Sequence, residues 1–513
     1  MERRSILSGL ILSFLLPCLA STVSAALFTG PFETPVAANP QGLTAGDLDR
    51  DGDLDLVVCH YSARLVTVLL NDGSGQFHQA PGSPMNGIPL PVSSVIGSFN
   101  PAIDAIPDLV VVGVSGFSAT AYLLFGDGTG RFHLATSVFL EATAEVGRQA
   151  AATDFNGEGV EDIVFTSGHV RLGSGSTFVA WTDLPMIPPV LEVTTGDFDG
   201  DGHPDAAFVS YTGSLLVYLS IRDTGYFIEA PGSPVEFGTG PENLVPADLD
   251  ADGDLDLVVT DIWEMGVHLL LNQGGGHFVH SGLLPVRAGY PRGIATADFD
   301  GDGHADLAVG SNNSPSLSVL LGDGAGGLHE IDESPLQLGD AAPVSIVAGD
   351  LNGDGGVDLA AVDFRGDRIA VFLHAPPPVR DITIDILPGS TDNVIRLGSQ
   401  GVLPVAILST EDFDATTVDP ATVRLAGAPV HLNAPGTYAC KPQDVNEDGR
   451  ADLLCKIDKA ALQLQAGDTV AVLEASTFDG EALRGQDAVR VLEGRAPHPP
   501  GATRWPGTVV PAP

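Results

Sequence analysis

The chain has 513 residues, too many for one ordinary hydrophobic core, so we expect several domains or a repeat array. Asp and Glu number 66 against 23 Lys and Arg, giving a formal net charge of −43, and the first lysine in the chain is Lys441. Few cations are therefore available to neutralise phosphates, which excludes nucleic acid as a partner and disfavours anionic lipid.

The first 25 residues are typical of a secretory signal peptide. Arg3 and Arg4 precede an apolar stretch from Ile6 to Ala20, and Val23–Ala25 is a small-residue cleavage site. Pro17 makes Cys18 a poor lipoprotein site. After cleavage near Ala25 we expect an extracellular or periplasmic protein. No later stretch approaches the roughly 20 apolar residues of a transmembrane span, so none is expected.

A nine-residue aspartate-rich pattern then recurs about every fifty residues. It has Asp at position 1, Asp or Asn at 3, Asp or Glu at 5, Gly at 6 and Asp at 9. Intact copies begin at Asp47, Asp154, Asp197, Asp248, Asp298 and Asp350, and a damaged copy with two extra residues begins at Ser98. The chain therefore contains seven visible repeat units.

Each unit continues with short β-type segments. A second apolar run ends in a Gly, Asn or Asp turn and an aromatic residue such as Phe77, Phe132 or Phe278, and helical periodicity is absent. About four strands per repeat of this length predict a propeller blade. The predicted strands that follow the loops are Leu54–Val58, Leu109–Val112, Ile163–Phe165, Leu255–Val259 and Leu307–Val309.

The two ends of the repeat region predict that the ring closes. Residues 27–36 are similar to the outer-strand segment that starts at Phe77, and the last unit ends after Ile369–Leu373, before an outer strand of its own. We therefore expect the N-terminal strand to complete the last blade, which would remove both exposed edges.

The loops offer oxygen ligands throughout, which suits Ca²⁺ with its 6–8 ligands better than Mg²⁺ or a transition metal. Side chains at positions 1, 3, 5 and 9 and the carbonyl at position 7 are the candidates, and Gly at 6 permits a sharp turn. An eighth copy begins at Asp444. The predicted ligand residues are Asp47, Asp49, Asp51, Asp53, Asp55, Asp154, Asn156, Glu158, Val160, Asp162, Asp197, Asp199, Asp201, His203, Asp205, Asp248, Asp250, Asp252, Asp254, Asp256, Asp298, Asp300, Asp302, His304, Asp306, Asp350, Asn352, Asp354, Gly356, Asp358, Asp444, Asn446, Asp448, Arg450 and Asp452.

The sequence is less consistent with three other interpretations of the loops. A single copy could be a solvated acidic turn, but six regularly spaced copies favour metal binding. An EF-hand would need a glutamate at position 12, where the first loop has Val58, and a calcium β-roll has a much shorter repeat. The damaged copy has Ala102 in place of a carboxylate, so it is predicted to be empty. About six Ca²⁺ are expected in the repeat region and one in the C-terminal part.

The loops, the D-L-V-V type strand and the segment L-L-N-D-G-S-G-Q-F closely resemble the FG-GAP/VCBS repeats of integrin-α-like propellers. The resemblance implies an all-β, seven-bladed propeller over about residues 26–377, with calcium loops that join consecutive strands of a blade. It implies Asp47, Asp49, Asp51, Asp55 and their equivalents as side-chain ligands.

The repeat stops after the Pro-rich link Ala375–Val379. Residues 381–492 alternate as in β-structure and resemble, more weakly, β-sandwich-like modules of bacterial secreted proteins. Their calcium loop is flanked by Cys440 and Cys455, and a disulfide between these would contribute about 3 kcal/mol. Cys59 is expected to be a buried thiol. Residues 493–513 are Pro-rich and predicted to be disordered.

The expected function is that of a secreted, monomeric binding or adhesion scaffold for protein or glycan partners. No G-x-S-x-G or H-E-x-x-H motif is present, so an enzyme is not expected. The alternatives are a lyase-type polysaccharide-degrading enzyme and a structural envelope or matrix component. The tripeptide Arg365–Asp367 falls at a strand-to-strand turn and is interpreted as a plain turn.

Overall fold

The computed structural model describes residues 26–492 apart from 101–104, 116–117, 141–148, 174–177, 186–188, 222–225, 340–341, 376–378, 398–400, 435 and 479–480. Tertiary contacts divide this chain into two compact units on either side of the segment 376–378. The predicted signal peptide, the C-terminal tail and Ala102 of the damaged loop lie outside the described residues.

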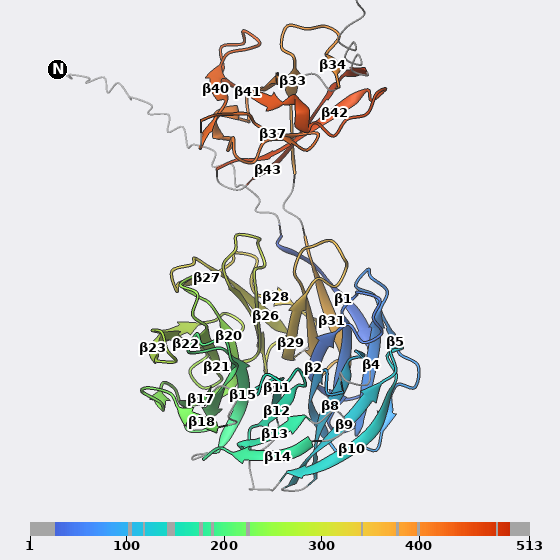
Figure 1. Ribbon diagram of the computed structural model, residues 1–513, viewed down its shortest axis with the longest axis vertical. Coiled ribbons are helices and arrows are strands. Elements are labelled where there is room, and N and C mark those ends of the chain that lie inside the picture. Colours follow the sequence, from blue (N-terminus) through green and yellow to red (C-terminus); the bar gives the residue numbers. More distant parts are fainter. Residues whose placement is uncertain are drawn as a thin grey trace, which may run out of the picture. The chain divides into compact units, whose positions relative to one another are not determined.

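The described residues 26–375 form seven antiparallel sheets, which we call blades 1 to 7 in chain order (Figure 1). In blades 1 to 6 four strands pair with their sequence neighbours, and blades 1, 4 and 6 add a short fifth strand; in blade 7 the N-terminal strand of the chain supplies the fourth strand. The first strands of consecutive blades contact one another around the ring, and the first strand of blade 7 contacts that of blade 1. The all-β propeller prediction is therefore confirmed.

The bounds of blades 1 to 3 follow the positions of the repeats. Blade 1 comprises β2 (Pro40–Gly46), β3 (Asp55–His60), β4 (Leu65–Asn71), β5 (Phe77–Gln79) and β6 (Met85–Asn86). Blade 2 comprises β7 (Pro91–Gly97), β8 (Asp108–Ser115), β9 (Ser118–Gly126) and β10 (Phe132–Leu140). Blade 3 comprises β11 (Ala150–Thr153), β12 (Asp162–Phe165), β13 (His169–Gly173) and β14 (Phe178–Asp183).

Blades 4 to 7 repeat the same order. Blade 4 comprises β15 (Val190–Gly196), β16 (Asp205–Ser210), β17 (Ser214–Ile221), β18 (Tyr226–Glu229) and β19 (Val235–Glu236). Blade 5 comprises β20 (Pro241–Ala247), β21 (Asp256–Asp261), β22 (Gly266–Asn272) and β23 (Phe278–Pro285). Blade 6 comprises β24 (Pro291–Ala297), β25 (Asp306–Ser311), β26 (Ser316–Gly322), β27 (Leu328–Glu330) and β28 (Leu336–Gln337). Blade 7 comprises β29 (Pro343–Gly349), β30 (Asp358–Asp363), β31 (Arg368–His374) and β1 (Phe28–Pro35).

The N-terminal strand closes the ring, as predicted. β1 pairs antiparallel with β31, the third strand of blade 7, from Phe28 opposite His374 to Pro35 opposite Arg368; the two strands lie side by side in Figure 1. Phe28 is buried and its ring meets the Phe299 ring edge-on, at 5.7 Å between centroids. The first and last parts of the propeller sequence therefore share one sheet.

The cores lie between neighbouring blades. Every residue of β3, β16, β21, β25 and β30 is buried, because each second strand is covered on both faces. The sequences of such strands are therefore continuous apolar runs, without alternation between apolar and polar residues. Position 2 of every propeller loop adds a buried apolar side chain, and these are Leu48, Phe99, Phe155, Phe198, Leu249, Phe299 and Leu351.

The first strands surround a central cavity of about 550 Å³. Its charged groups are Glu192, Glu242 and Arg292, and the Arg292 Nε lies 3.4 Å from the Glu242 Oε2. Desolvation in the cavity raises the pKa of Glu192 to about 8. The middle of the propeller is therefore polar, in contrast to the apolar layers between the blades.

The C-terminal unit has a β-rich core of its own. Its larger sheets have the orders β32-β43-β42-β36-β37 and β33-β35-β41-β40, and both contribute to one cluster that includes Leu403, Ile457 and Leu473. Its elements are β32 (Arg380–Ile382), β33 (Ile384–Ile386), β34 (Val394–Arg396), β35 (Val402–Ile407), the 3-10 helix η1 (Ala415–Thr417), β36 (Arg424–Leu425), β37 (Ala428–Pro429), β38 (Leu432–Ala434), β39 (Thr437–Tyr438), β40 (Cys440–Gln443), β41 (Asp452–Asp458), the 3-10 helix η2 (Lys459–Ala461), β42 (Val470–Ser476), β43 (Ala482–Ala488) and β44 (Arg490–Leu492).

Candidate metal loops

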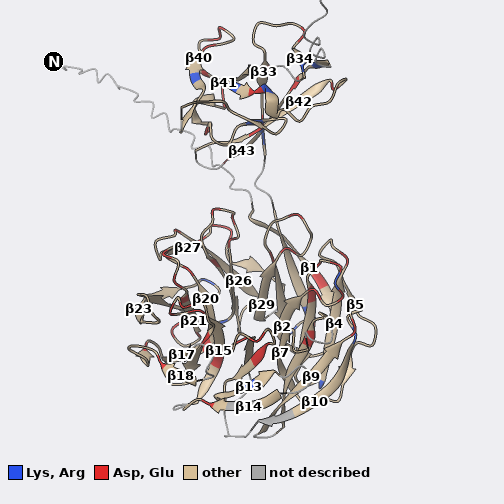
Figure 2. Ribbon diagram, in the orientation of Figure 1, with Lys and Arg blue, Asp and Glu red and all other residues tan. Residues whose placement is uncertain are grey.

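The aspartate-rich loops of the propeller all connect the first strand of a blade to its second strand. In an antiparallel meander these loops and the turns between third and fourth strands lie at one end of the blades. We call this end the metal-loop face. Figure 2 shows acidic segments on the blades and few basic ones, in keeping with the charge of the chain.

Within a loop, the carboxylates first organise the backbone. In blade 4 the Asp197 Oδ2 accepts a hydrogen bond from the Gly202 N–H at 2.8 Å, and the Asp199 Oδ1 accepts one from the Asp201 N–H at 3.1 Å. The Asp201 Oδ1 accepts one from the His203 N–H at 2.9 Å. The loop therefore turns around its own acidic side chains, and Gly202, with φ of 87°, makes that turn without strain.

In four loops the structure brings together three of the predicted carboxylates: those at positions 1, 3 and 9 in three loops, and those at positions 1, 3 and 5 in the fourth. In each of these, one oxygen from each of three aspartates lies within 4.8 Å of the others. The three loops with asparagine at position 3 contain Asn156, Asn352 or Asn446, and these amide oxygens accept the position-5 N–H as Asp199 does. The four carboxylate groups are Asp47, Asp49 and Asp55; Asp197, Asp199 and Asp205; Asp248, Asp250 and Asp256; and Asp298, Asp300 and Asp302.

The loops fit a bound cation. Among the described residues, the buried oxygens Asp49 Oδ1, Asp248 Oδ1 and Asp250 Oδ1 have no hydrogen-bond partner in the protein. Burial, together with the neighbouring carboxylates, raises the pKa of Asp49 and Asp250. A buried, unpaired carboxylate oxygen is costly, and a cation between the carboxylates would remove that cost.

Position 9 has a role that the sequence did not reveal. Two of the five predicted strands begin one residue before this aspartate and three begin one residue after it, whereas every second strand of a blade begins on it, and its side chain is fully buried. In blade 4 the Asp205 Oδ2 accepts the Phe198 N–H at 2.9 Å and its Oδ1 accepts the Ser220 N–H at 2.7 Å. One carboxylate thus joins the loop, the second strand and the third strand.

The same two backbone hydrogen bonds recur throughout the propeller. Burial raises the pKa of Asp55, Asp256 and Asp306 to about 6 and that of Asp162 and Asp205 to about 7. The pairs of donors are Leu48 and Asn71 for Asp55, Phe155 and Gly173 for Asp162, Leu249 and Asn272 for Asp256, Phe299 and Gly322 for Asp306, and Leu351 and His374 for Asp358.

The damaged loop of blade 2 keeps this structural role without the acidic turn. Asp108 is buried, and its oxygens accept the Phe99 and Gly126 N–H groups at 3.2 Å each. Ser98, which replaces the first aspartate, donates its N–H to the Glu161 Oε2 of the neighbouring blade at 3.2 Å. Sequence reasoning missed Glu161 because this contact joins two blades.

The loop of the C-terminal unit has the same hydrogen bonds. The Asp444 Oδ2 accepts the Gly449 N–H at 3.0 Å, and Asp452 accepts the N–H groups of Val445 and Ser409, both at 2.8 Å. The Arg450 guanidinium approaches the Asp448 Oδ2 at 3.2 Å. Arg450 therefore pairs with one of the predicted ligands, and its positive charge would compete with a metal ion for Asp448.

The cysteines are as expected. Cys440 and Cys455 face each other across the paired strands β40 and β41 and form a disulfide. Cys59 is a buried free thiol, and burial raises its pKa to about 12.

The tripeptide Arg365–Asp367 lies in the turn between β30 and β31, as predicted. The Asp363 Oδ1 accepts hydrogen bonds from the Arg365 and Gly366 N–H groups. The Asp367 Oδ1 accepts the Asn39 N–H at 2.8 Å, which ties this turn to blade 1. The three residues therefore have a structural role in the closing part of the ring.

Within the described part of the chain, no helix is long and apolar enough to span a membrane. A family model described as an FG-GAP-like repeat matches residues 197–259, 248–309 and 298–361. No curated protein matches the chain.

Three of the solved structures that match this chain are as follows. The crystal structure of BBS1N in complex with ARL6DN, soaked with mercury, is 14% identical over 68% of this chain and 98% of that one, with a TM-score of 0.48. The rhamnogalacturonan lyase YesW is 14% identical over 66% and 62%, with a TM-score of 0.40, and Chaetomium thermophilum Raptor is 11% identical over 68% and 30%, with a TM-score of 0.41. The family match therefore shows three consecutive FG-GAP-like repeats within residues 197–361, and these repeats form blades of a β-propeller.

Proposed function

We propose that this protein is a secreted binding module whose propeller is stabilised by calcium and whose partner docks on the face opposite the metal loops. The observation that carries the proposal is a group of exposed aromatic side chains on that face, which we call the aromatic face. It comprises Tyr211, Trp263 and Tyr290, which are 61%, 72% and 42% exposed.

These three side chains belong to three consecutive blades. Tyr211 and Trp263 lie in the turns between second and third strands of blades 4 and 5, and Tyr290 lies in the connection into blade 6. A backbone hydrogen bond fixes the chain at or beside each ring. The Tyr211 N–H donates to the Pro189 carbonyl, and the Ile262 N–H donates to the Gly240 carbonyl. The Tyr290 carbonyl accepts the Asn312 N–H. Exposed rings on a rigid frame lose little entropy on binding, and Trp and Tyr are enriched at binding hot spots.

Calcium has a structural role in this proposal. Positions 1, 3, 5 and 9 of six propeller loops and of the Asp444 loop would hold about seven ions, and the damaged loop would hold none. The ions would neutralise carboxylates that otherwise repel each other, which couples calcium binding to folding. The metal loops are at the opposite end of the blades from the aromatic face, so the ions would not contact the partner.

The partner class follows from charge and surface chemistry. The propeller sequence has no lysine, so the aromatic face suits a neutral glycan or a protein segment rather than a polyanion. The signal-like N-terminus supports secretion, and a monomer is the expected state. No observation on the aromatic face favours the lyase alternative.

A glycan array together with a panel of secreted and cell-surface proteins tests the proposal. Trp263→Ala should weaken binding of whichever partner is found by at least about 10-fold, because an exposed tryptophan at a hot spot contributes 1.4 kcal/mol or more. Phe478→Ala is the matched control, since Phe478 is 68% exposed but belongs to the C-terminal unit.

Equal binding by wild type and Trp263→Ala would contradict the assignment of this face. Incubation with neutral and acidic polysaccharides, followed by assays for new unsaturated or reducing ends, tests the enzyme alternative. New ends produced by the wild-type protein would replace the binding-module proposal with a polysaccharide-degrading activity.

A further inference from the structure

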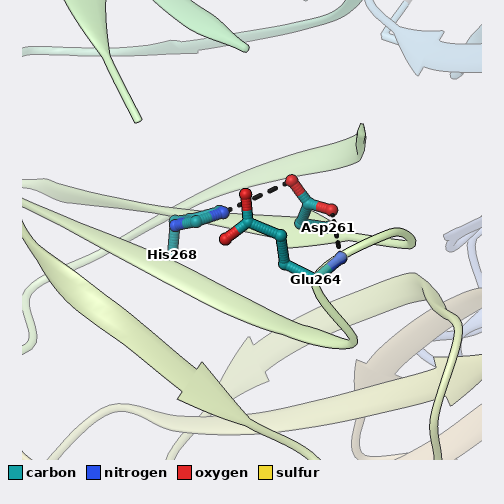
Figure 3. Close-up of side chains that lie close together, drawn as sticks. All are labelled: Asp261, Glu264 and His268. Carbon is teal, nitrogen blue, oxygen red and sulfur yellow. Dashed lines mark hydrogen bonds and ion pairs between the residues drawn. The ribbon is translucent and has the colours of Figure 1, made fainter. Parts of the chain in front are cut away.

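Blade 5 contains a second cluster of metal-ligating side chains, at the opposite end of β21 from the acidic loop. Asp261 ends β21, Glu264 lies in the following turn and His268 lies in β22. One ligand atom from each lies within 4.8 Å of the other two, and Figure 3 shows the three side chains converging. We propose that Asp261, Glu264 and His268 bind a divalent transition-metal ion of the zinc class.

The distances suit such an ion. The His268 Nε2 lies 3.4 Å from the Asp261 Oδ2, which is long for a hydrogen bond. Two ligands about 2.1 Å from a tetrahedral zinc ion are about 3.4 Å apart. Imidazole nitrogen with two carboxylates is a ligand set for zinc-like ions, whereas the metal loops offer oxygen alone.

The surrounding residues orient the ligands. The His268 Nδ1 is 3.1 Å from the His280 Nε2 on β23, so His280 can accept the Nδ1–H and leave Nε2 as the ligand atom. The Thr239 Oγ1 donates to the Glu264 Oε1 at 3.2 Å.

Asp261 is held independently of any ion. Its Oδ1 accepts the Trp263 and Glu264 N–H groups at 2.9 and 2.8 Å, and its Oδ2 accepts those of Thr239 and Gly240 at 3.0 and 2.9 Å. A Cβ on Gly238 would lie 2.6 Å from both the Asp261 Oδ2 and the His268 Nε2. Glycine at this position therefore leaves the space beside both ligand atoms without a side chain.

Other blades show which residues the turn requires and which residues belong to the cluster alone. In blade 7 Asp363 binds the Arg365 and Gly366 N–H groups just as Asp261 binds its turn, but Gly366 and Ala370 stand where blade 5 has Glu264 and His268. Turn formation thus needs the aspartate alone. Blade 6 has Ser318 and Glu330 in place of His268 and His280. The Ser318 Oγ donates a hydrogen bond to the Glu330 Oε1 at 2.5 Å.

The test uses the full chain without a polyhistidine tag, in saturating Ca²⁺ so that the loops are filled. Titration with Co²⁺ should give visible d–d absorption that saturates near one ion per chain, and calorimetric titration with Zn²⁺ should give the same stoichiometry. His268→Ser, which copies blade 6, should abolish the absorption. Glu264→Gln alters an exposed side chain, leaves folding intact and should weaken Zn²⁺ binding by at least about 10-fold.

His277→Ser is the matched control, because His277 is exposed on the same blade and lies outside the cluster; it should bind Co²⁺ as wild type does. His280→Ala should weaken Zn²⁺ binding by about 10-fold without changing its stoichiometry. If wild type, Glu264→Gln and His268→Ser bind Co²⁺ and Zn²⁺ alike, the metal proposal is wrong. Asp261, His268 and His280 would then form a hydrogen-bonded chain without a metal.

Discussion

At the residue scale, the last aspartate of each propeller loop pairs with backbone N–H groups, and in three loops it also lies beside other carboxylates. The pattern suggests a ligand, and Asp55, Asp205 and Asp256 do lie with other carboxylates. The same side chain pairs two buried backbone N–H groups, and Asp108 does so in a loop that has lost its acidic turn. Retention of the aspartate there is explained by these bonds, independently of calcium.

Replacement of Asp108 should therefore destabilise the propeller with or without calcium. Asp108→Ala leaves two buried N–H groups unpaired, which costs about 2–4 kcal/mol of unfolding free energy. Asp127→Ala, an exposed turn aspartate of the same blade, should cost less than about 1 kcal/mol. Urea unfolding in Ca²⁺ and in EDTA measures both. If Asp108→Ala lowers the unfolding free energy in Ca²⁺ but not in EDTA, Asp108 acts through calcium.

His60 should make the propeller sensitive to acid. Burial lowers its pKa to about 4, against about 6.5 in the unfolded chain. His60 therefore becomes protonated below about pH 6.5 in the unfolded state, but only near pH 4 in the folded state. Stability from the neutral ring is present above pH 6.5 and is lost as the pH falls to 4, by at most about 3 kcal/mol.

Comparison of wild type with His60→Gln isolates this contribution. The difference in unfolding free energy between the two proteins should move by about 2–3 kcal/mol in favour of the variant between pH 7 and pH 4. Carboxylates titrate alike in both proteins and cancel. A constant difference across this range would mean that His60 is protonated equally in the folded and unfolded states.

At the element scale, β1 joins two ends of the propeller sequence. Its strand neighbours on β31 are more than 300 residues away, as in the Asn39 to Asp367 hydrogen bond that follows it. Such a contact costs loop-closure entropy that only a closed ring repays. The strand therefore acts as the closure of the ring rather than as an extension of blade 1.

Two phenylalanines of β1 test this closure. Phe28 is 6% exposed and packs against Phe299, whereas Phe32 is 45% exposed. Phe28→Ala should lower the unfolding free energy by about 3–5 kcal/mol, and Phe32→Ala by less than about 1 kcal/mol. Thermal unfolding of both variants, alongside deletion of residues 26–36, measures the effect. An unchanged Tm on deletion would contradict ring closure by β1.

The disulfide belongs to the C-terminal unit alone. It links the two strands that flank the Asp444 loop, so a double replacement of Cys440 and Cys455 by Ser should lower the stability of that unit by about 3 kcal/mol. The propeller transition should not change. Calorimetry resolves the two transitions, and wild type in reductant is the control, since Cys59 is buried and unpaired.

At the scale of the whole molecule, charge and fold are coupled. A chain of net charge −43 gathers carboxylates at one end of its blades, and several of their buried oxygens lack protein partners. Self-repulsion opposes the compact state unless cations are bound. The propeller should therefore depend on calcium more than its apolar cores suggest.

Chelation should lower the Tm of the propeller well beyond a control at equal ionic strength in monovalent salt. Calcium titration should give about seven ions per chain. Asp250→Asn removes one ligand from one loop, so it should lower the count by about one and lower the Tm in Ca²⁺ but little in EDTA. A Tm indifferent to EDTA would overturn the structural role proposed for calcium.

The sequence alone determined much of the architecture. The repeat period, the loop pattern and the apolar runs are local features, so they predicted the all-β propeller, the positions of its loops and the pairing of β1 with the last blade. The order of residues likewise predicted that carboxylates meet within a loop, as Asp47, Asp49 and Asp55 do. Local spacing is sufficient here because each group forms within about nine residues.

Tertiary structure decided what each residue does beyond its own loop. The backbone bonds of Asp108, the contact of Glu161 with Ser98, the cluster of Asp261, Glu264 and His268, and the aromatic face all depend on chain segments that only folding brings together. A period in the sequence shows that units are alike. The consequences of differences between units depend on burial and on the neighbouring strands, because these determine which atoms face each other.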